Sequence, residues 1–149
     1  MKKLEYQKNN RRIQSLQDIW SFELTHNIEF RDVLKEFLLK YEGVRLADSN
    51  KYYYSCGHIL QELNQVVYLN KSDQGGASIE SILEVHKEEG ILDFIPFGTD
   101  SGGWDYNISI NKETYGQVWV NKFDIGDTDS MEYVTSSFEE FIDNLGPEV

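Results

Sequence analysis

The chain has 149 residues, about the length of one domain, and 40% of its residues are hydrophobic and 13% aromatic, which excludes a disordered or fibrous chain. Its single cysteine, Cys56, excludes an internal disulfide and a Cys-x-x-Cys metal site. The 26 acidic and 14 basic residues give a formal net charge of −12.

The first part of the chain is basic and the rest is acidic. Five basic residues and one acidic residue give residues 1–12 a charge of +4, so residues 13–149 carry −16. Such a field repels nucleic acid and anionic membranes and speeds the encounter with a basic partner, although acidity can also serve solubility alone. We expect residues 1–11 to form a flexible basic arm and residues 12–149 to form a single domain.

Two amphipathic helices are predicted after the arm. The first runs from Arg12 to Leu24, where apolar residues recur at helical spacing. These residues are Ile13, Leu16, Ile19, Trp20 and Leu24. The second runs from Phe30 to Tyr41 with a continuous apolar stripe, and Gly43 follows where a helix C-cap is expected.

The region from residue 44 to residue 76 gives weaker signals. We expect a loop over Arg45–Lys51, a β-favouring aromatic run at Tyr52–Tyr54 and a short strand at Gln65–Leu69. The pattern of His58–Asn64 fits a helix or a loop equally. Residues 71–76 are a cluster of turn-forming residues.

A short helix and a buried strand are predicted next. Ser78–Glu89 places Ile79, Ile82, Leu83 and His86 on one helix face, which favours a packed histidine. Ile91–Phe97 has the composition of a buried strand.

The segment Pro96–Ile110, with sequence PFGTDSGGWDYNISI, predicts a β-hairpin. The Gly102-Gly103 pair tolerates the positive φ angles of a tight turn. Beyond it the residues alternate, as in a strand with one buried face. Trp104, Tyr106, Ile108 and Ile110 form the apolar face, and Asp105, Asn107, Ser109 and Asn111 form the other.

The remaining chain predicts two strands and a closing helix. Gln117–Phe123 is rich in Val, Trp and Phe, an acidic loop follows, and Met131–Thr135 could add an edge strand. Ser137 and Glu140 have the spacing of a capping box before an apolar helix. The predicted class is therefore α+β, with N-terminal helices, a central antiparallel sheet with short turns, and a closing C-terminal helix.

Three segments in this order resemble the SUKH superfamily of SMI1/KNR4-like domains. They are SIESILEVHKEEGILDFIPFGTDSGGWDYNISI, YGQVWVNKF and SSFEEFIDNL, and the helix FRDVLKEFLLKYEG is similar to the family's second helix. The resemblance implies function by binding. Bacterial members are immunity proteins that block polymorphic or contact-dependent toxin domains, frequently nucleases, and other members are regulatory interaction modules. The family is not known for catalysis.

A protein that inhibits a nuclease must cover a basic surface, for which carboxylates and aromatic anchors are suited. The candidate partner-binding residues are Asp100, Trp104, Asp105, Trp119, Asp124, Asp127, Asp129 and Tyr53. Asp100 could equally bond nearby amides within its turn, and both tryptophans could belong to the core. The predicted partner is a cognate toxin domain with a basic surface, bound by a monomer or a weak homodimer.

Other functional classes receive little support from the sequence. Cys56-Gly57-His58 places a thiol near an imidazole, but nothing in the sequence orients that histidine, so we expect no enzyme. Asp124, Asp127 and Asp129 lack the glycine and the terminal glutamate of a calcium loop, and we expect neither metal nor cofactor. Without a long apolar run or a secretory signal, a cytoplasmic protein with no membrane partner is expected.

Overall fold

A computed structural model describes residues 1–8, 10–46, 52–56, 59–125 and 130–147. Within these residues the chain forms β1 (Tyr6–Lys8), α1 (Leu16–His26), α2 (Asp32–Tyr41), β2 (Arg45–Leu46), β3 (Tyr53–Cys56), β4 (Ile59–Glu62), β5 (Gln65–Val66), α3 (Ile79–Glu88), β6 (Phe94–Thr99), β7 (Asp105–Ser109), β8 (Val118–Asn121), β9 (Met131–Thr135) and α4 (Phe138–Asp143). The predicted α+β class is confirmed.

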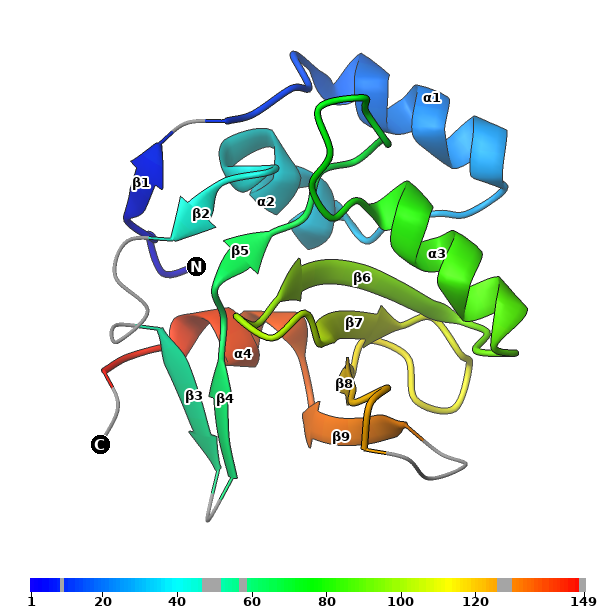
Figure 1. Cartoon of the computed structure of the whole chain (residues 1–149). Helices are drawn as coiled ribbons and strands as arrows, with labels where there is room; N and C mark the ends of the chain where they lie inside the picture. Colours follow the sequence, from blue (N-terminus) through cyan, green and yellow to red (C-terminus); the bar gives the residue numbers. More distant parts are fainter. Residues whose placement is uncertain (9, 47–51, 57–58, 126–129, 148–149) are drawn as a thin grey trace.

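The main sheet has the strand order β1-β2-β5-β6-β7-β8-β9, and every neighbouring pair is antiparallel. Strands β3 and β4 form a separate two-stranded hairpin that projects beside α4 (Figure 1). A bridge between Tyr53 and Gly146 ties this hairpin to the residues that follow α4. The predicted hairpin at Pro96–Ile110 is present as β6 and β7.

One face of the β6–β7 hairpin packs on the aromatic core, as the alternating pattern predicts. Tyr106 and Ile108 are fully buried. The ring of Phe97 lies 4.9 Å from Phe138 of α4, and Tyr106 lies 5.2 Å from Phe141, measured between ring centroids. Aromatic pairs in this range contribute about 0.5–1.5 kcal/mol beyond their buried area. The closing helix therefore fixes the inner face of the hairpin.

The opposite face of β7 differs from the prediction. Asp105, Asn107 and Ser109 were expected to face solvent, but all three are buried. Helix α3 lies over this side of the hairpin (Figure 1), and His86 of α3 bonds to Asp105. A strand covered on both faces can still alternate in polarity when a helix supplies polar partners.

Helix α1 buries only part of the predicted stripe. Ile19 and Phe22 are buried, whereas Trp20 is 48% exposed and Leu24 is 85% exposed. The helix begins at Leu16 rather than Arg12, and Ile13 is buried ahead of it. The buried residues follow i, i+3 spacing, and the ring of Phe22 stacks on Phe30 at 5.7 Å.

Helix α2 agrees with the prediction, and its C-terminal turn is tightly packed. Its apolar stripe is buried, including Leu34, Phe37 and Leu38. Gly43 follows with φ +73°, and a Cβ at this position would overlap the ring of Tyr68. Glycine is therefore required by both backbone and space.

The N-terminal residues, predicted as an arm, lie against the domain in the structure. Leu4 is buried, and its backbone N–H donates to the Tyr41 hydroxyl at 3.0 Å. Strand β1 pairs with β2, with Tyr6 opposite Leu46. The basic charges of this segment thus remain next to the acidic domain.

The short strands account for the other differences from the prediction. Arg45 opens β2 instead of a loop, and residues 59–62 form β4 instead of a helix or loop. Strand β6 begins at Phe94 rather than Ile91.

The N-terminus of α4 forms only half of the predicted capping box. The Ser137 hydroxyl accepts from the backbone N–H of Glu140 as predicted, but the Glu140 carboxylate accepts from the hydroxyls of Thr135 and Ser136.

Candidate functional site

The turn between β6 and β7 is organised by one carboxylate. Asp100 Oδ1 accepts the backbone N–H groups of Gly102 at 2.9 Å and Trp104 at 2.8 Å. Gly103 has φ +94°, which a residue with a side chain rarely adopts. Asp100 therefore bonds nearby amides within its turn, and because it is only half-buried it is also a possible contact for a partner.

Residues of the β3–β4 hairpin reach the same turn. Glu62 Oε1 accepts the N–H of Ser101 at 2.9 Å, and Glu62 Oε2 accepts from the Tyr53 hydroxyl at 3.3 Å. Partial burial raises the pKa of Asp100 above its ordinary value, and the nearby negative charge of Glu62 raises it further. Tyr53 is thus joined to the turn through Glu62, a residue that the sequence analysis did not identify.

On the other side of the turn, Trp104 is held by a polar contact. Its Nε1–H donates to Asp124 Oδ1 at 2.6 Å. The ammonium group of Lys122 lies 5.1 Å from the centre of the Trp104 ring and forms an ion pair with Glu132 at 2.9 Å. Trp104 is half-buried, so one part of its ring remains accessible beside two carboxylates.

Asp105 lies beneath this surface. Its Oδ2 accepts from His86 Nε2 at 2.9 Å and from Asn107 Nδ2 at 2.8 Å. Only 5% of Asp105 is exposed, so it is not a residue of the open surface. His86, expected to pack on apolar residues, instead carries this buried hydrogen bond.

Trp119 lies on the same sheet face, one strand away. The register places Trp119 opposite Asn107, and its ring contacts Phe94 at 5.8 Å and Tyr133 at 5.9 Å. Tyr133 is 47% exposed. The three rings form an aromatic cluster on the β8–β9 side of the sheet, next to the polar residues of β7.

Two predicted contact residues and part of the thiol–imidazole pair lie outside the part of the chain that the structure describes. Asp127 and Asp129 lie outside the described residues, as do Gly57 and His58 of the thiol–imidazole pair. No group of three or more His, Cys, Asp or Glu side chains that could hold a metal occurs in the part of the chain that the structure describes. No helix among the described residues is long and apolar enough to cross a membrane.

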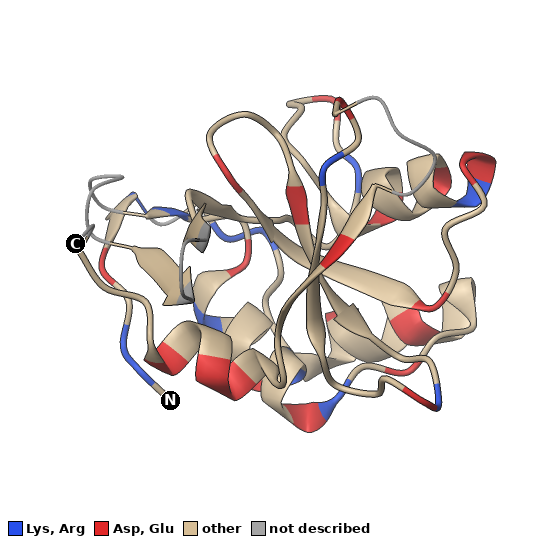
Figure 2. Cartoon of the chain, turned by 90° about the horizontal axis from the view of Figure 1, so that it is seen from below, with Lys and Arg blue, Asp and Glu red and all other residues tan. Residues whose placement is uncertain are grey.

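Figure 2 shows that acidic residues, drawn in red, occur on helices, strands and turns, and that basic residues are fewer. The turn region therefore belongs to a domain that is acidic overall. What distinguishes it is the combination of Asp100, Glu62 and Asp124 with a half-buried tryptophan at one end of the sheet.

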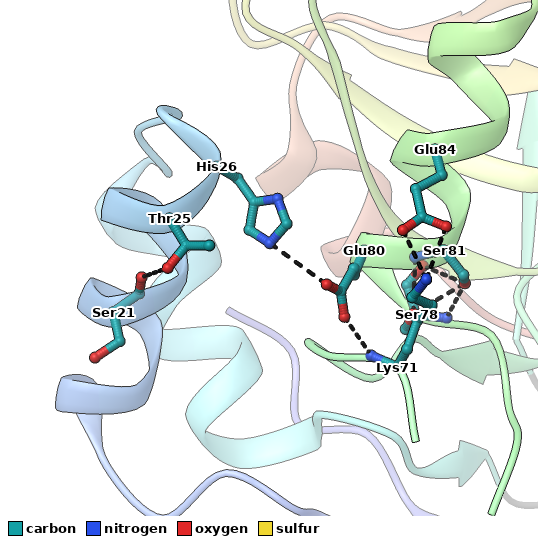
Figure 3. A network of polar contacts seen from close by, with 8 residues as sticks. All are labelled: Ser21, Thr25, His26, Lys71, Ser78, Glu80, Ser81 and Glu84. Atoms are coloured by element: carbon teal, nitrogen blue, oxygen red, sulfur yellow. Dashed lines mark hydrogen bonds and ion pairs between the residues drawn. The ribbon is translucent and has the colours of Figure 1, made fainter. Parts of the chain in front are cut away.

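A second polar network connects α1 with α3 (Figure 3). His26 Nε2 lies 3.8 Å from Glu80 Oε2, and Glu80 Oε1 accepts a hydrogen bond from the backbone N–H of Lys71 at 2.8 Å. Lys71 also pairs with Glu84, and this hydrogen bond raises the pKa of the Lys71 ammonium. Because these groups satisfy one another, the network is suited to bracing the two helices.

The family model described as SMI1 / KNR4 family (SUKH-1) matches residues 14–144. Comparisons with curated proteins and with solved structures found no match.

Proposed function

The chain belongs to the SMI1/KNR4 (SUKH-1) family, which includes immunity proteins, and we propose that it binds and neutralises a cognate toxin domain. It would act by occluding the active or substrate-binding surface of the toxin, in the cytoplasm of the cell that it protects. The observation that carries this proposal is the turn between β6 and β7, which brings three carboxylates to one half-buried tryptophan.

The chemistry of this surface favours a toxin domain that holds phosphates, such as a nuclease. A nuclease surface is basic, and the net charge of −12 would speed its encounter with the domain. Long-range attraction raises the association rate, whereas aromatic side chains in desolvated contacts contribute most of the affinity.

The proposed contact surface, here called the turn surface, consists of Tyr53, Glu62, Asp100, Trp104 and Asp124. These residues are linked by the hydrogen bonds described above. The sequence-based candidates Trp119, Asp127 and Asp129 are proposed as further contributors to binding. Asp105 would take part only through the cavity considered below.

Co-expression with the toxin domain encoded beside this gene tests the proposal. Cell survival and co-purification of the two proteins at a one-to-one ratio are the expected results. If the neighbouring toxin domain kills cells despite expression of this protein, the immunity function is refuted. A gene neighbourhood without any toxin domain would instead favour a regulatory interaction module.

Charge reversal tests the steering role of the acidic loop. Asp127→Lys with Asp129→Lys should slow association with the toxin severalfold at low salt and flatten its salt dependence. Asp73→Lys makes the same type of charge change in an exposed turn and is the matched control. Equal association rates for the double variant and wild type would contradict steering by this loop.

A further inference from the structure

A cavity of about 280 Å³ opens between α3 and the end of the sheet. Its walls are mainly apolar and include Ile82 and Val85 of α3 and Phe123 after β8. Ser81, Glu89, Gly103, Asp105 and Asn121 complete the lining. Val85 and Phe123 are each about half exposed, so the apolar wall continues to the surface.

The polar end of the cavity consists of two buried side chains. Asp105 and Asn121 lie directly opposite each other on β7 and β8, and only 5% and 2% of them are exposed. His86 and Asn107 both donate to Asp105 Oδ2. Among the described residues Asn121 Oδ1 is buried without a partner, and both side-chain hydrogen bonds to the Asp105 carboxylate go to Oδ2.

These groups select the chemistry of a ligand. The buried amide oxygen of Asn121 requires a hydrogen-bond donor, and the carboxylate of Asp105 beside it favours a donor that carries a positive charge. Glu89 adds a second carboxylate to the lining. An anion would be repelled, and a neutral apolar group would leave the amide oxygen of Asn121 unpaired. A cation on an aliphatic stem satisfies the acceptors and the apolar wall together.

We propose that this cavity receives a lysine or arginine side chain of a protein partner. The inference rests on the proposed function, because the occupant is a basic residue of the partner. Its position supports this assignment, since Gly103 lines the cavity and the next residue, Trp104, belongs to the turn surface. One basic partner would then contact the turn surface and insert a side chain beside it.

Small-molecule probes test the cavity without any partner. Nα-acetyl-lysine N-methylamide and the corresponding arginine derivative are titrated into the labelled protein, and amide chemical shifts are recorded by NMR. Shifts should concentrate on the residues that line the cavity. The norleucine derivative has a similar stem without the charge, and it should bind at least tenfold more weakly. Equal binding of the norleucine derivative would overturn the proposal.

Two variants assign the effect to the cavity. Asp105→Asn keeps the size of the side chain and should weaken probe binding at least tenfold, and a thermal melt verifies that it folds. Val85→Lys changes an exposed residue of the wall and should block binding by placing its own ammonium in the cavity. Tyr115→Lys adds the same charge at an exposed position in another turn and should leave probe binding unchanged.

The toxin complex separates this inference from the proposed function. Loss of toxin affinity in Asp105→Asn and Val85→Lys, with retention in Tyr115→Lys, supports the anchor cavity. Unchanged toxin affinity in both cavity variants refutes the anchor while the immunity function stands. Probe binding without any toxin binding refutes the immunity function, because the cavity would then be a basic-group site unconnected with a toxin.

Discussion

Substitution of Asp100 tests whether one carboxylate organises the turn surface. Asp100→Ala removes the acceptor for two backbone N–H groups, and hydrogen bonds to charged groups contribute about 1.5–3 kcal/mol each when shielded from water. Because Gly102 is exposed, we expect a total loss of about 2 kcal/mol in the free energy of unfolding. For a domain of this size that loss lowers Tm by about 4–8 °C.

Asp100→Asn separates the charge of this residue from its hydrogen bonds. The amide oxygen can still accept both N–H groups, so the variant should lose less than about 1 kcal/mol at pH 7. Burial raises the pKa of Asp100, so the folded state binds more protons than the unfolded state just above pH 3.8, the ordinary pKa of the group. Stability contributed by this group therefore falls as pH rises through the raised pKa, and Asp100→Asn should lack this component.

Urea unfolding of the wild type and both variants between pH 3.5 and pH 7 measures these effects. Asp73→Asn, in an exposed turn, is the control and should match the wild type. An unfolding midpoint of Asp100→Ala equal to that of the wild type would show that the turn forms without the carboxylate. An unaltered pH dependence in Asp100→Asn would show that its charge is not destabilised by burial.

Three further tests, with five substitutions, concern the fold that supports this surface. Glu42→Ala should lower the free energy of unfolding by about 3 kcal/mol in urea titrations, because three backbone N–H groups lose a buried acceptor. Stability equal to that of the wild type would refute the structural role of the Glu42 carboxylate. Gly43→Ala should be much less stable than Gly90→Ala in thermal melts. Both glycines have positive φ, but only Gly43 lacks space for a Cβ, so equal melts would contradict the packing argument. Trp20→Glu changes an exposed side chain and should change Tm by less than about 2 °C. Phe22→Ala empties a buried site and should lower the free energy of unfolding by about 3 kcal/mol, and thus lower Tm far more. A larger loss of stability in Trp20→Glu than in Phe22→Ala would show that α1 buries Trp20, as the sequence predicted.

The sequence predicted the elements whose apolar pattern has one solution. Helix α2 and strand β7 carry long, regular stripes, and their inner faces are buried as expected. Helix α1 offers two stripes that share Ile19: the predicted one continues through Trp20 and Leu24, and the observed one through Phe22. The stripe that is buried depends on where α2 and the ring of Phe30 pack against α1. The sequence of α1 alone does not contain this tertiary contact.

The candidate site was predicted in part for the same reason. Asp100, Trp104 and Asp124 were identified because they flank glycine turns and strand ends, and hydrogen bonds with Trp104 join them in the structure. Glu62 and His86 were not, since each acquires its role from a partner at least 19 residues away in sequence. A two-residue or four-residue strand gives no periodic signal that would place Glu62.

The polar face of β7 connects the fold with the proposed function. A strand covered on both sides is most stable with apolar residues on both faces, yet here Asp105 and Asn107 are buried and Asn121 faces Asp105 from β8. Sequences depart from locally favourable choices mainly where a functional site requires it. Hydrogen bonds from His86 and Asn107 explain the burial of Asp105, but the Oδ1 atom of Asn121 is buried without a partner among the described residues. A basic side chain from a partner would supply the donor that Asn121 Oδ1 lacks. Binding would therefore explain a buried polar group that packing within the domain does not explain.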